Sequence, residues 1–517
     1  MKQTAVPIVG QARAFAVDEL FFSTTDSRGI ITAGNEVFVR ISGYTTGELI
    51  GTAHNIIRHP DMPRAAFRLV WDRLKAGKPA AALVKNRAKD GCYYWVVALI
   101  TPTPGGYLSV RFKPAGPFLP IIEELYGRMT AAERQARESG ADQKTVMDEG
   151  AAVLNEGLAS HKFADYDSFM WVMLCEELKS RDAVLTKANR SLVRPLPADF
   201  SQRATRHPAL NHLGIIYANG TRAYEQLNRL YHRLDEFVSL NQTLDRKSSF
   251  VNKLTDELRI SSINVALAST RLGGEGQGLA VISRHMGETS IDVAGSVHGL
   301  VSGITALSDR LRGVIFNIVS ARLQVEMLLT FVHELISSEA TADASDKRRG
   351  LIKTLHDAFS GTMGQASVAL HDLETTVHPL SAMADDLERF MLSLQVAQVS
   401  ALVESARISN QGDFLDIFVS IKEQIDQTHD ELAELSDALH RLDRLALDTP
   451  AVAREIKATV DRIDQDICAL PTESVVAAPG AGAPAAKADR HPPAKSPGPR
   501  TLAPRAPSAA NCDATFA

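Results

Sequence analysis

The sequence predicts an α+β domain at the N-terminus, followed by a mostly α-helical region of long coiled-coil hairpins and a disordered C-terminal tail. Three observations predict this class. Short apolar runs separated by turn residues fill positions 15–115, and apolar residues recur every seven positions from about residue 222 onward. Positions 471–517 are rich in proline, alanine and glycine, so they cannot bury enough apolar surface to fold.

A tail is predicted over residues 1–14 and the α+β domain over residues 15–115. "LFFSTTDSRGIITAGN" predicts two short strands around the turn Asp26–Gly29, and "NEVFVRISGY" predicts a short helix that ends near Gly43. "PRAAFRLVWDRLKAG" predicts a helix with Pro63 near its first turn and Gly77 at its end. "AALVKNRAKDGCYYWVVALITP" predicts a hairpin that turns at its Asp-Gly dipeptide, and "GGYLSVRFK" adds a last strand. One face of such a sheet is left to cover a ligand or a partner.

The helical region begins with a connector, residues 116–220, that is broken by Pro195, Pro197 and Pro208. Residues 221–336 then predict a coiled-coil signalling hairpin, because a sustained seven-residue repeat marks helices that supercoil around a partner. The repeating residues are Leu230, Phe237, Leu244, Val251, Leu258, Val265 and Leu272, then Leu279, Met286, Val293, Leu300, Leu307 and Val314, with Val297, Ile304, Leu311 and Ile318 as a companion row. Such seams predict a homodimer through the coiled coil.

A second helical hairpin is predicted over residues 351–470, after a loop at 337–350. An internal repeat supports two related hairpins. "SINVALASTRLGGEGQGL" (262–279) aligns without gaps on "QVSALVESARISNQGDFL" (398–415). The alignment places Leu267 on Val403 and Arg271 on Arg407, so the first hairpin is expected to have its tip near 264–282.

Composition excludes several classes of function. The formal charge of −5 is spread without a basic block, so no nucleic-acid surface is predicted. The cysteines at 92, 175, 468 and 512 do not fall at metal-ligand spacing, which predicts neither a disulfide framework nor a zinc site. No signal peptide is visible, and the most apolar long stretch, Phe316–Ile336, carries Arg322, Glu326, His333 and Glu334. A membrane span needs about 20 mostly uncharged residues, so the protein is expected to be cytoplasmic.

Three blocks of the N-terminal domain carry a specific resemblance. "STTDSRGIITAGNEVFVRISGYTTGELIG", "HNIIRHPDMPRAAFRLVW" and "LVKNRAKDGCYYWVVA" occur in the order and at the spacing of the N-terminal PAS domain of bacterial aerotaxis (energy-taxis) receptors, which residues 20–112 resemble. The resemblance implies FAD bound without covalent attachment, and a domain that reports its redox state. The residues at matching positions around that site are Asn35, Arg58, His59, Asp61, Trp71, Asn86 and Tyr94.

The chemistry of these residues suits a flavin. Arg58 could pair with the anionic diphosphate, Asn86 could contact the polar edge of the ring, and Trp71 could pack on the ring. The chain departs from the family at Ala80, where the family has a tryptophan. Two alternatives stay open: Arg58 and His59 tie the loop to the sheet without a cofactor, or His59 binds haem.

The glycine-rich stretch "RLGGEGQGLAV" (271–281) follows a predicted helix and not a strand, which excludes a dinucleotide-binding loop. With its flanks it resembles the cytoplasmic tip of methyl-accepting chemotaxis receptors. The resemblance implies contacts with the chemotaxis histidine kinase and its coupling protein. The matching residues are Asn264, Arg271, Gly273, Gly276 and Gly278, with Leu267 in the same helix, while Ala268 and Gly274 stand where the family has glutamates.

Together these features predict a cytoplasmic redox or oxygen sensor that signals in chemotaxis or aerotaxis through helix contacts and is not an enzyme. A histidine kinase is disfavoured because "LTDELRISSINVAL" has Asp256 where the phospho-accepting histidine would stand, and no ATP-binding domain is visible. A flavin-dependent reductase is disfavoured because no nicotinamide loop is visible. The alternative is a divergent regulator of motility or biofilm that does not couple to the chemotaxis kinase.

Overall fold

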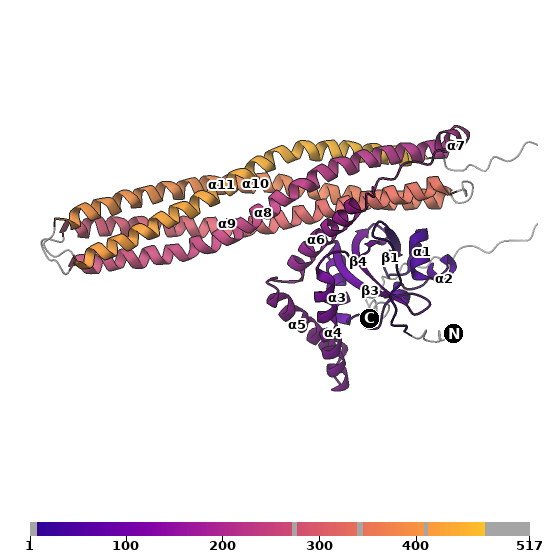
Figure 1. Ribbon diagram of the computed structural model, residues 1–517, viewed down its shortest axis with the longest axis horizontal. Helices are drawn as coiled ribbons and strands as arrows, with labels where there is room; N and C mark the ends of the chain where they lie inside the picture. The colour runs from indigo at the N-terminus through magenta and orange to yellow at the C-terminus, as the bar shows by residue number, and fades with distance from the viewer. Residues whose placement is uncertain (1–7, 271–276, 339–344, 408–411, 471–517) are drawn as a thin grey trace, which may run out of the picture.

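The computed structural model describes residues 8–270, 277–338, 345–407 and 412–470. Figure 1 shows a long rod of parallel and antiparallel helices, with a smaller sheet domain lying against one side of it. The sheet domain sits toward the end of the rod that carries α7, and the rod extends well beyond it in the other direction. This arrangement confirms the predicted fold class, an antiparallel α+β domain followed by mostly helical structure.

The sheet domain is built on five antiparallel strands in the described part of the chain, in the order β2-β1-β5-β4-β3. Their bounds are β1 Phe21–Asp26, β2 Ile31–Gly34, β3 Ala80–Arg87, β4 Tyr93–Thr103 and β5 Gly106–Phe112. The β3–β4 hairpin turns through Gly91, whose φ of 88° suits glycine, as the Asp-Gly signal predicted. The first and last strands of the sequence pattern, β1 and β5, pair at its centre.

Short helices cover one face of this sheet. They are α1 (Glu36–Ser42), α2 (Thr46–Leu49), the 3-10 helix η1 (His54–Ile57) and α3 (Arg64–Lys75). Gly43 ends α1 in the left-handed conformation with φ of 72°, and Gly77 follows α3 with φ of 73°, as the sequence predicted. Pro63 is the residue before the first turn of α3, and the α3 amides of Arg64 and Ala65 donate to the carboxylate of Glu133 instead of a capping side chain.

The connector contains α4 (Phe118–Glu138), α5 (Gln143–Ser160), α6 (Tyr166–Lys187) and α7 (Phe200–Arg206). Pro208, expected to break the connector, is instead the first residue of the rod helix α8, a position at which proline's missing N–H has no helical partner to lose. The rod is made of α8 (Pro208–Thr270), α9 (Gln277–Ser337), α10 (Ser345–Ser405) and α11 (Gly412–Cys468), called the bundle below.

The bundle closes on itself within one chain. α8 packs on α9, α9 on α10, α10 on α11, and α11 back on α8. The predicted seam residues that the structure describes are buried in this core: Leu230, Phe237, Leu244, Val297, Leu300, Ile304, Leu307, Leu311, Val314 and Ile318. The second hairpin therefore covers the apolar stripe of the first, and the described seams are buried without a second copy. The homodimer stays a prediction.

The sheet lies between a helix-covered inner face and an outer face that the bundle contacts. Alternate residues of β1, β4 and β5 point outward, and these include Phe22, Thr101 and Phe112. Phe22 packs edge-to-face on Phe331 of α9, with ring centroids 5.2 Å apart, and the Thr101 hydroxyl accepts a hydrogen bond from Gln324 of α9. The outer face of the sheet is thus joined directly to a bundle helix.

One buried and one partly buried ion pair tie α6 to α9 at this place. Arg181 Nη2 lies 2.7 Å from Glu326 Oε1, with the two side chains 0% and 2% exposed. Arg322 Nη2 lies 2.9 Å from Asp182 Oδ2. We call these residues the α6–α9 joint; the Arg181 guanidinium also lies 5.6 Å from the Phe112 ring of β5.

Burial in the bundle explains why α9 has a long apolar stretch. By length and composition Gly295–Ser337 could cross a membrane, but 89% of its most apolar window is buried inside the protein. Its charged residues Arg322 and Glu326 are matched by partners from α6. Burial in the bundle therefore accounts for its apolar character.

Candidate ligand site in the sheet domain

A cavity lies on the inner face of the sheet, between the strands, η1 and α3. Its volume, counted out to its open mouth, is about 710 Å³. Its walls are mostly apolar, with a few polar groups at one end, which is the usual character of a small-molecule site. The lining residues are Ser23, Thr25, His54, Asn55, Ile57, Arg58, Phe67, Val70, Trp71, Leu74, Val84, Asn86, Ala98, Ile100, Tyr107, Ser109 and Arg111.

The polar end of the cavity is organised around Arg111 of β5, which is 3% exposed. Its Nη1 donates to Ser23 Oγ at 2.9 Å, and its Nη2 donates to His54 Nε2 at 2.7 Å. Burial lowers the pKa of Arg111 to about 10, so the guanidinium keeps its charge at neutral pH. Within the described residues no carboxylate pairs with it, and a buried cation with neutral partners alone is an unusual and costly arrangement.

His54 is held neutral beside this cation. Burial first, and then the charge of Arg111, lower the pKa of His54 well below its ordinary value. The ring therefore accepts at Nε2 and carries its proton on Nδ1. It also stacks on Phe38 of α1, with centroids 6.3 Å apart and planes 4° apart. Phe38 lies 5.7 Å from the Arg111 guanidinium, so α1 packs against the two residues of the polar end.

Two buried polar atoms in the cavity wall have no hydrogen-bond partner among the described residues, namely Asn86 Nδ2 of β3 and Ser109 Oγ of β5. An unsatisfied buried donor costs about 1–3 kcal/mol, so native proteins rarely keep one without a use. With Arg111, these groups offer donors to a ligand whose edge carries acceptors.

The opposite wall is aromatic. Trp71 of α3 packs edge-to-face on Tyr107 of β5, with centroids 5.0 Å apart, and the Arg58 guanidinium lies 4.5 Å above the Phe67 ring. Arg58 Nη2 also donates to the Met62 carbonyl at 3.0 Å. A flat apolar ligand would find stacking surfaces here.

A second, more polar pocket adjoins the cavity and shares Asn55 and Arg58 with it. Its other lining residues are His59, Pro60, Met62, Arg64, Thr130, Glu133, Arg134 and Arg137. Burial is the largest cause that lowers the pKa of Arg58 to about 10, and nearby Arg64 adds to it. Arginines converging from a loop, α3 and α4 favour an anionic group such as a phosphate.

The structure places the residues predicted around the flavin in different surroundings. Arg58, Trp71 and Asn86 line the cavity together. His59 lines the second pocket, where its Nδ1 accepts from the Asp61 amide and its Nε2 has no partner among the described residues. Asp61 is exposed and pairs with Lys85 at 2.9 Å.

The remaining two predicted residues lie away from the cavity lining. Tyr94 is buried in the core formed with Phe15, and burial raises the pKa of its hydroxyl. Asn35 caps α1, since its Oδ1 accepts from the Phe38 amide, and its Nδ2 donates to Glu334 of α9 at 3.2 Å. Ala80 is fully buried at the start of β3 and is absent from the lining.

Sequence reasoning missed His54, Ser109 and Arg111. His54 stands in one of the quoted blocks, four residues before Arg58. Tyr107, Ser109 and Arg111 alternate along β5 and share the inner face, so an arginine at an inward position of a strand was the available signal. Recognising that Arg111 points inward required the register of β5.

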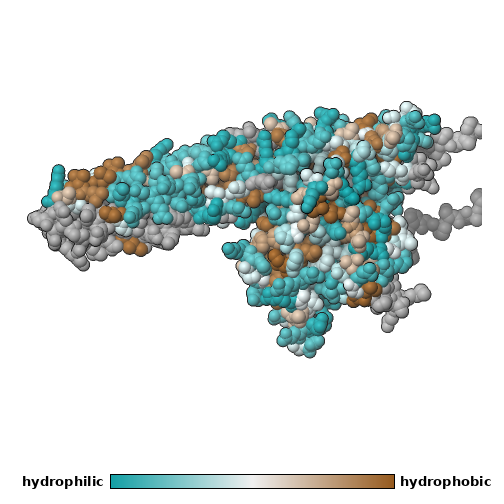
Figure 2. All heavy atoms as spheres, in the orientation of Figure 1, coloured by the Kyte–Doolittle hydropathy of each residue, from teal (hydrophilic) through white to brown (hydrophobic). Residues whose placement is uncertain are grey.

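The predicted partner residues that the structure describes lie at the far end of the bundle. Asn264 and Leu267 belong to the last turns of α8, and Gly278 belongs to the first turn of α9. Arg271 and Gly276 lie outside the described residues. The described surface at this end is unusually apolar, and Figure 2 shows apolar surface gathered there. Its exposed apolar side chains, called the tip patch below, are Ile260, Ile263, Val281, Leu392, Val396, Val399, Val403 and Val419.

Known proteins share the fold of the sheet domain. Residues 31–106 match the family described as the PAS fold, so the N-terminal domain is a PAS domain. This match covers the sheet domain from β2 to the end of β4 and leaves the bundle unassigned.

Two relatives extend the similarity. The aerotaxis receptor of Escherichia coli (strain K12) is 41% identical over 135 residues, which is 25% of this chain and 27% of that protein. The nitrogen fixation regulatory protein of Klebsiella pneumoniae is 25% identical over 279 residues, which is 50% of this chain and 56% of that protein. The chain therefore spans about half, or less, of the length of these relatives.

Among solved structures, the light state of the blue-light photoreceptor Aureochrome1 LOV aligns with 23% of this chain and 93% of its own, at 16% identity and a TM-score of 0.18. The Rhodobacter sphaeroides LOV protein aligns with 28% of this chain and 87% of its own, at 17% identity and a TM-score of 0.18.

Proposed function

We propose that this chain is a cytoplasmic redox sensor that holds FAD in its PAS domain and signals through the bundle to a protein partner, without catalysing a reaction. The observation that carries the proposal is the buried Arg111, which faces an apolar cavity together with the unpartnered Asn86 Nδ2 and Ser109 Oγ. A flavin has an apolar ring with hydrogen-bond acceptors along one edge, which suits this set of donors.

The second pocket supports a dinucleotide over a smaller flavin. Arg58 borders both spaces, and Arg64, Arg134 and Arg137 line the second one. We assign the ring to the cavity and the diphosphate to the arginine-lined pocket. When bound, a flavin gains or loses electrons and protons at its ring, which changes the hydrogen bonds that its edge makes. Haem ligated by His59 is the weaker assignment, because His59 lines the polar second pocket and is absent from the lining of the apolar cavity that would have to hold a porphyrin ring.

A continuous set of contacts joins the cavity to α9. Arg111 and His54 both lie against Phe38, whose amide donates to Asn35 Oδ1 at 3.3 Å. Asn35 Nδ2 and the Glu36 amide donate to the two carboxylate oxygens of Glu334, at 3.2 and 2.8 Å. A shift of Arg111 on ligand reduction would move α1 against α9, and a bundle can pass such a small displacement along its length.

We further propose that the output is the tip patch, which binds the chemotaxis histidine kinase and its coupling protein. Val396 and Val399 are 67% and 56% exposed, and contiguous exposed apolar surface commonly marks a protein-binding site. The similarity to an aerotaxis receptor supports this choice of partner.

A second candidate is a regulator that controls another protein and leaves the chemotaxis kinase alone. It is favoured by the nitrogen fixation regulatory protein, whose similarity covers twice as much of this chain, 50% against 25%, as that of the aerotaxis receptor. Affinity capture with the kinase and coupling protein separates the two. Retention by wild type and loss in a Val396→Ser, Val399→Ser variant supports the first, and no retention supports the second.

The flavin assignment is tested by titrating FAD into the flavin-stripped full chain and following flavin fluorescence. Wild type is expected to quench it, and Arg111→Met to bind about 10- to 100-fold more weakly, since a charged hydrogen bond contributes about 1.5–3 kcal/mol. Arg28→Met is the matched control, because Arg28 is an exposed arginine of the same domain. Equal affinity in both variants, or no binding by wild type, would refute the assignment.

A further inference from the structure

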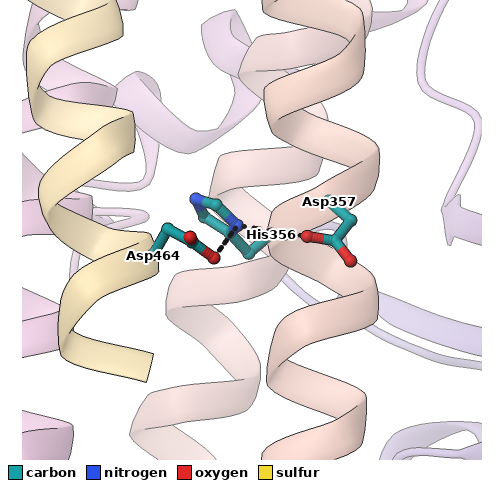
Figure 3. Close-up of side chains that lie close together, drawn as sticks. All are labelled: His356, Asp357 and Asp464. Atoms are coloured by element: carbon teal, nitrogen blue, oxygen red, sulfur yellow. Dashed lines mark ion pairs between the residues drawn. The ribbon is translucent and has the colours of Figure 1, made fainter. Parts of the chain in front are cut away.

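A histidine and two aspartates meet where α10 and α11 lie side by side, outside the ligand site of the sheet domain (Figure 3). His356 and Asp357 come from α10, and Asp464 comes from α11, one turn before its end. One possible ligand atom from each residue lies within 4.8 Å of the others. His356 Nδ1 is 3.5 Å from Asp357 Oδ1 and 3.8 Å from Asp464 Oδ1.

The hydrogen bonding of His356 leaves its Nδ1 available to bind a metal ion. Its Nε2 is 3.0 Å from the Val460 carbonyl, which can only accept, so Nε2 carries the proton in the neutral ring. Its Nδ1 then presents a lone pair, and this buried nitrogen has no hydrogen-bond partner among the described residues although the side chain is only 3% exposed. A carbonyl that holds the second nitrogen is the usual support of a metal-bound histidine.

A cation already occupies the carboxylate side of the cluster. Lys353 Nζ lies 3.1 Å from Asp357 Oδ1 and 3.3 Å from Asp464 Oδ1, and the lysine side chain is half-exposed. Lys353, Asp357 and Thr354 also line a groove between α10 and the sheet domain, which provides an entry path for an ion from solvent. The ammonium can therefore leave to water while the two carboxylates stay in place.

We propose that His356, Asp357 and Asp464 form a binding site for a divalent transition-metal ion, which displaces the Lys353 ammonium and clamps α10 to α11. One imidazole and two carboxylates are a ligand set of Zn²⁺ sites that keep a water in the remaining position. Two ligand atoms on a tetrahedral zinc lie about 3.3 Å apart. The distances of 3.5 and 3.8 Å require only small side-chain rotations.

The test uses the full chain without a histidine tag, stripped with EDTA and titrated with Zn²⁺ by calorimetry. Wild type is expected to bind one equivalent and to unfold at a higher temperature with zinc, because an ion that binds only the folded state stabilises it. His356→Ala is expected to lose both effects. His371→Ala is the matched control, since His371 lies on the same helix beside Glu374 but is exposed. It should behave like wild type.

Two further variants separate a metal site from a network of ion pairs. Lys353→Met removes the competing cation and is expected to tighten Zn²⁺ binding by about tenfold. Asp464→Asn keeps the shape of the side chain and should abolish binding even if His356→Ala does not fold. Wild type that binds no zinc, zinc binding that survives Asp464→Asn, or Lys353→Met that binds no tighter than wild type would each overturn the proposal.

Discussion

The buried arginines on the two faces of the sheet differ in their partners. Beyond the outer face, in the α6–α9 joint, Arg181 and Arg322 each lie within 3 Å of a carboxylate, at 2.7 and 2.9 Å. On the inner face, Arg111 contacts the hydroxyl of Ser23 and the neutral ring of His54, and no carboxylate among the described residues. A neutralised buried charge makes a fixed joint, whereas an unneutralised one leaves room for an anionic or acceptor-rich ligand.

The comparison is tested most strongly by removing a partner from the joint. Glu326→Ala is expected to destabilise the full chain by about 3–5 kcal/mol, because it leaves the buried Arg181 charge without its carboxylate. The free energy of unfolding in urea measures this effect. Glu156→Ala is the control, as Glu156 is an exposed carboxylate that lies 3.8 Å from Arg128. A loss in Glu326→Ala no larger than that of the control would show that the joint is not held by its ion pairs.

On the inner face, by contrast, removing the buried arginine should cost the ligand-free protein little stability. Arg111→Met is expected to leave the ligand-free protein within about 1 kcal/mol of wild type, since it removes a buried charge whose described partners are neutral. The same variant is expected to show a smaller gain in melting temperature with FAD than wild type, because it binds FAD more weakly. Thermal unfolding with and without FAD measures both. A large loss of stability in the ligand-free variant would make Arg111 a structural residue.

The contact of Glu334 with Asn35 and Glu36 should show in the pH dependence of the free energy of unfolding. Burial raises the pKa of Glu334 above its usual value of 4.5, although hydrogen bonds from Glu36 and Asn35 oppose this. The folded state therefore keeps this proton after the unfolded chain has lost it, so Glu334 lowers stability as the pH rises from 4.5 through the folded-state pKa.

Glu334→Gln removes this titration. The stability of wild type relative to the variant should fall across that window, by at most about 1.4 kcal/mol per pH unit. Urea unfolding at a series of pH values measures the difference. Parallel curves for the two proteins would mean that the Glu334 carboxylate has an ordinary pKa.

The smallest effect on stability is expected at the tip patch. Val396→Ser with Val399→Ser changes exposed side chains, so the free energy of unfolding should move by less than about 0.5 kcal/mol while partner capture is lost. Val368→Ser is the control, because Val368 is 63% exposed on the same helix and lies outside the tip patch. Equal loss of capture in both variants would remove the tip patch as the output.

The sequence predicted much of this fold because its signals were local. Turn glycines such as Gly43 and Gly77 marked helix ends, and the heptads marked the buried seams. Heptads say that a helix needs a partner and do not say which, so closure of the bundle by the second hairpin was not predictable from them. The internal repeat was the signal that related the two hairpins.

The candidate site was predictable in part for the same reason. Arg58, Trp71 and Asn86 came from blocks that resemble a known family, and all line the cavity. Arg111 faces the cavity only because the register of β5 turns it inward. Asn35 lies away from the cavity lining because its Oδ1 caps α1 and its Nδ2 donates to Glu334 of α9. Such orientations depend on long-range packing, which a local pattern does not contain.

The central claim is that chemistry in the cavity reaches the bundle through the start of α1. Hydrogen exchange of the FAD-loaded full chain, oxidised and then reduced with dithionite, tests it most directly. The account predicts that the exchange of the Glu36 and Phe38 amides changes on reduction in wild type and stays unchanged in the flavin-free protein treated in the same way. Bound flavin that is reduced without any change in exchange at these amides would contradict it.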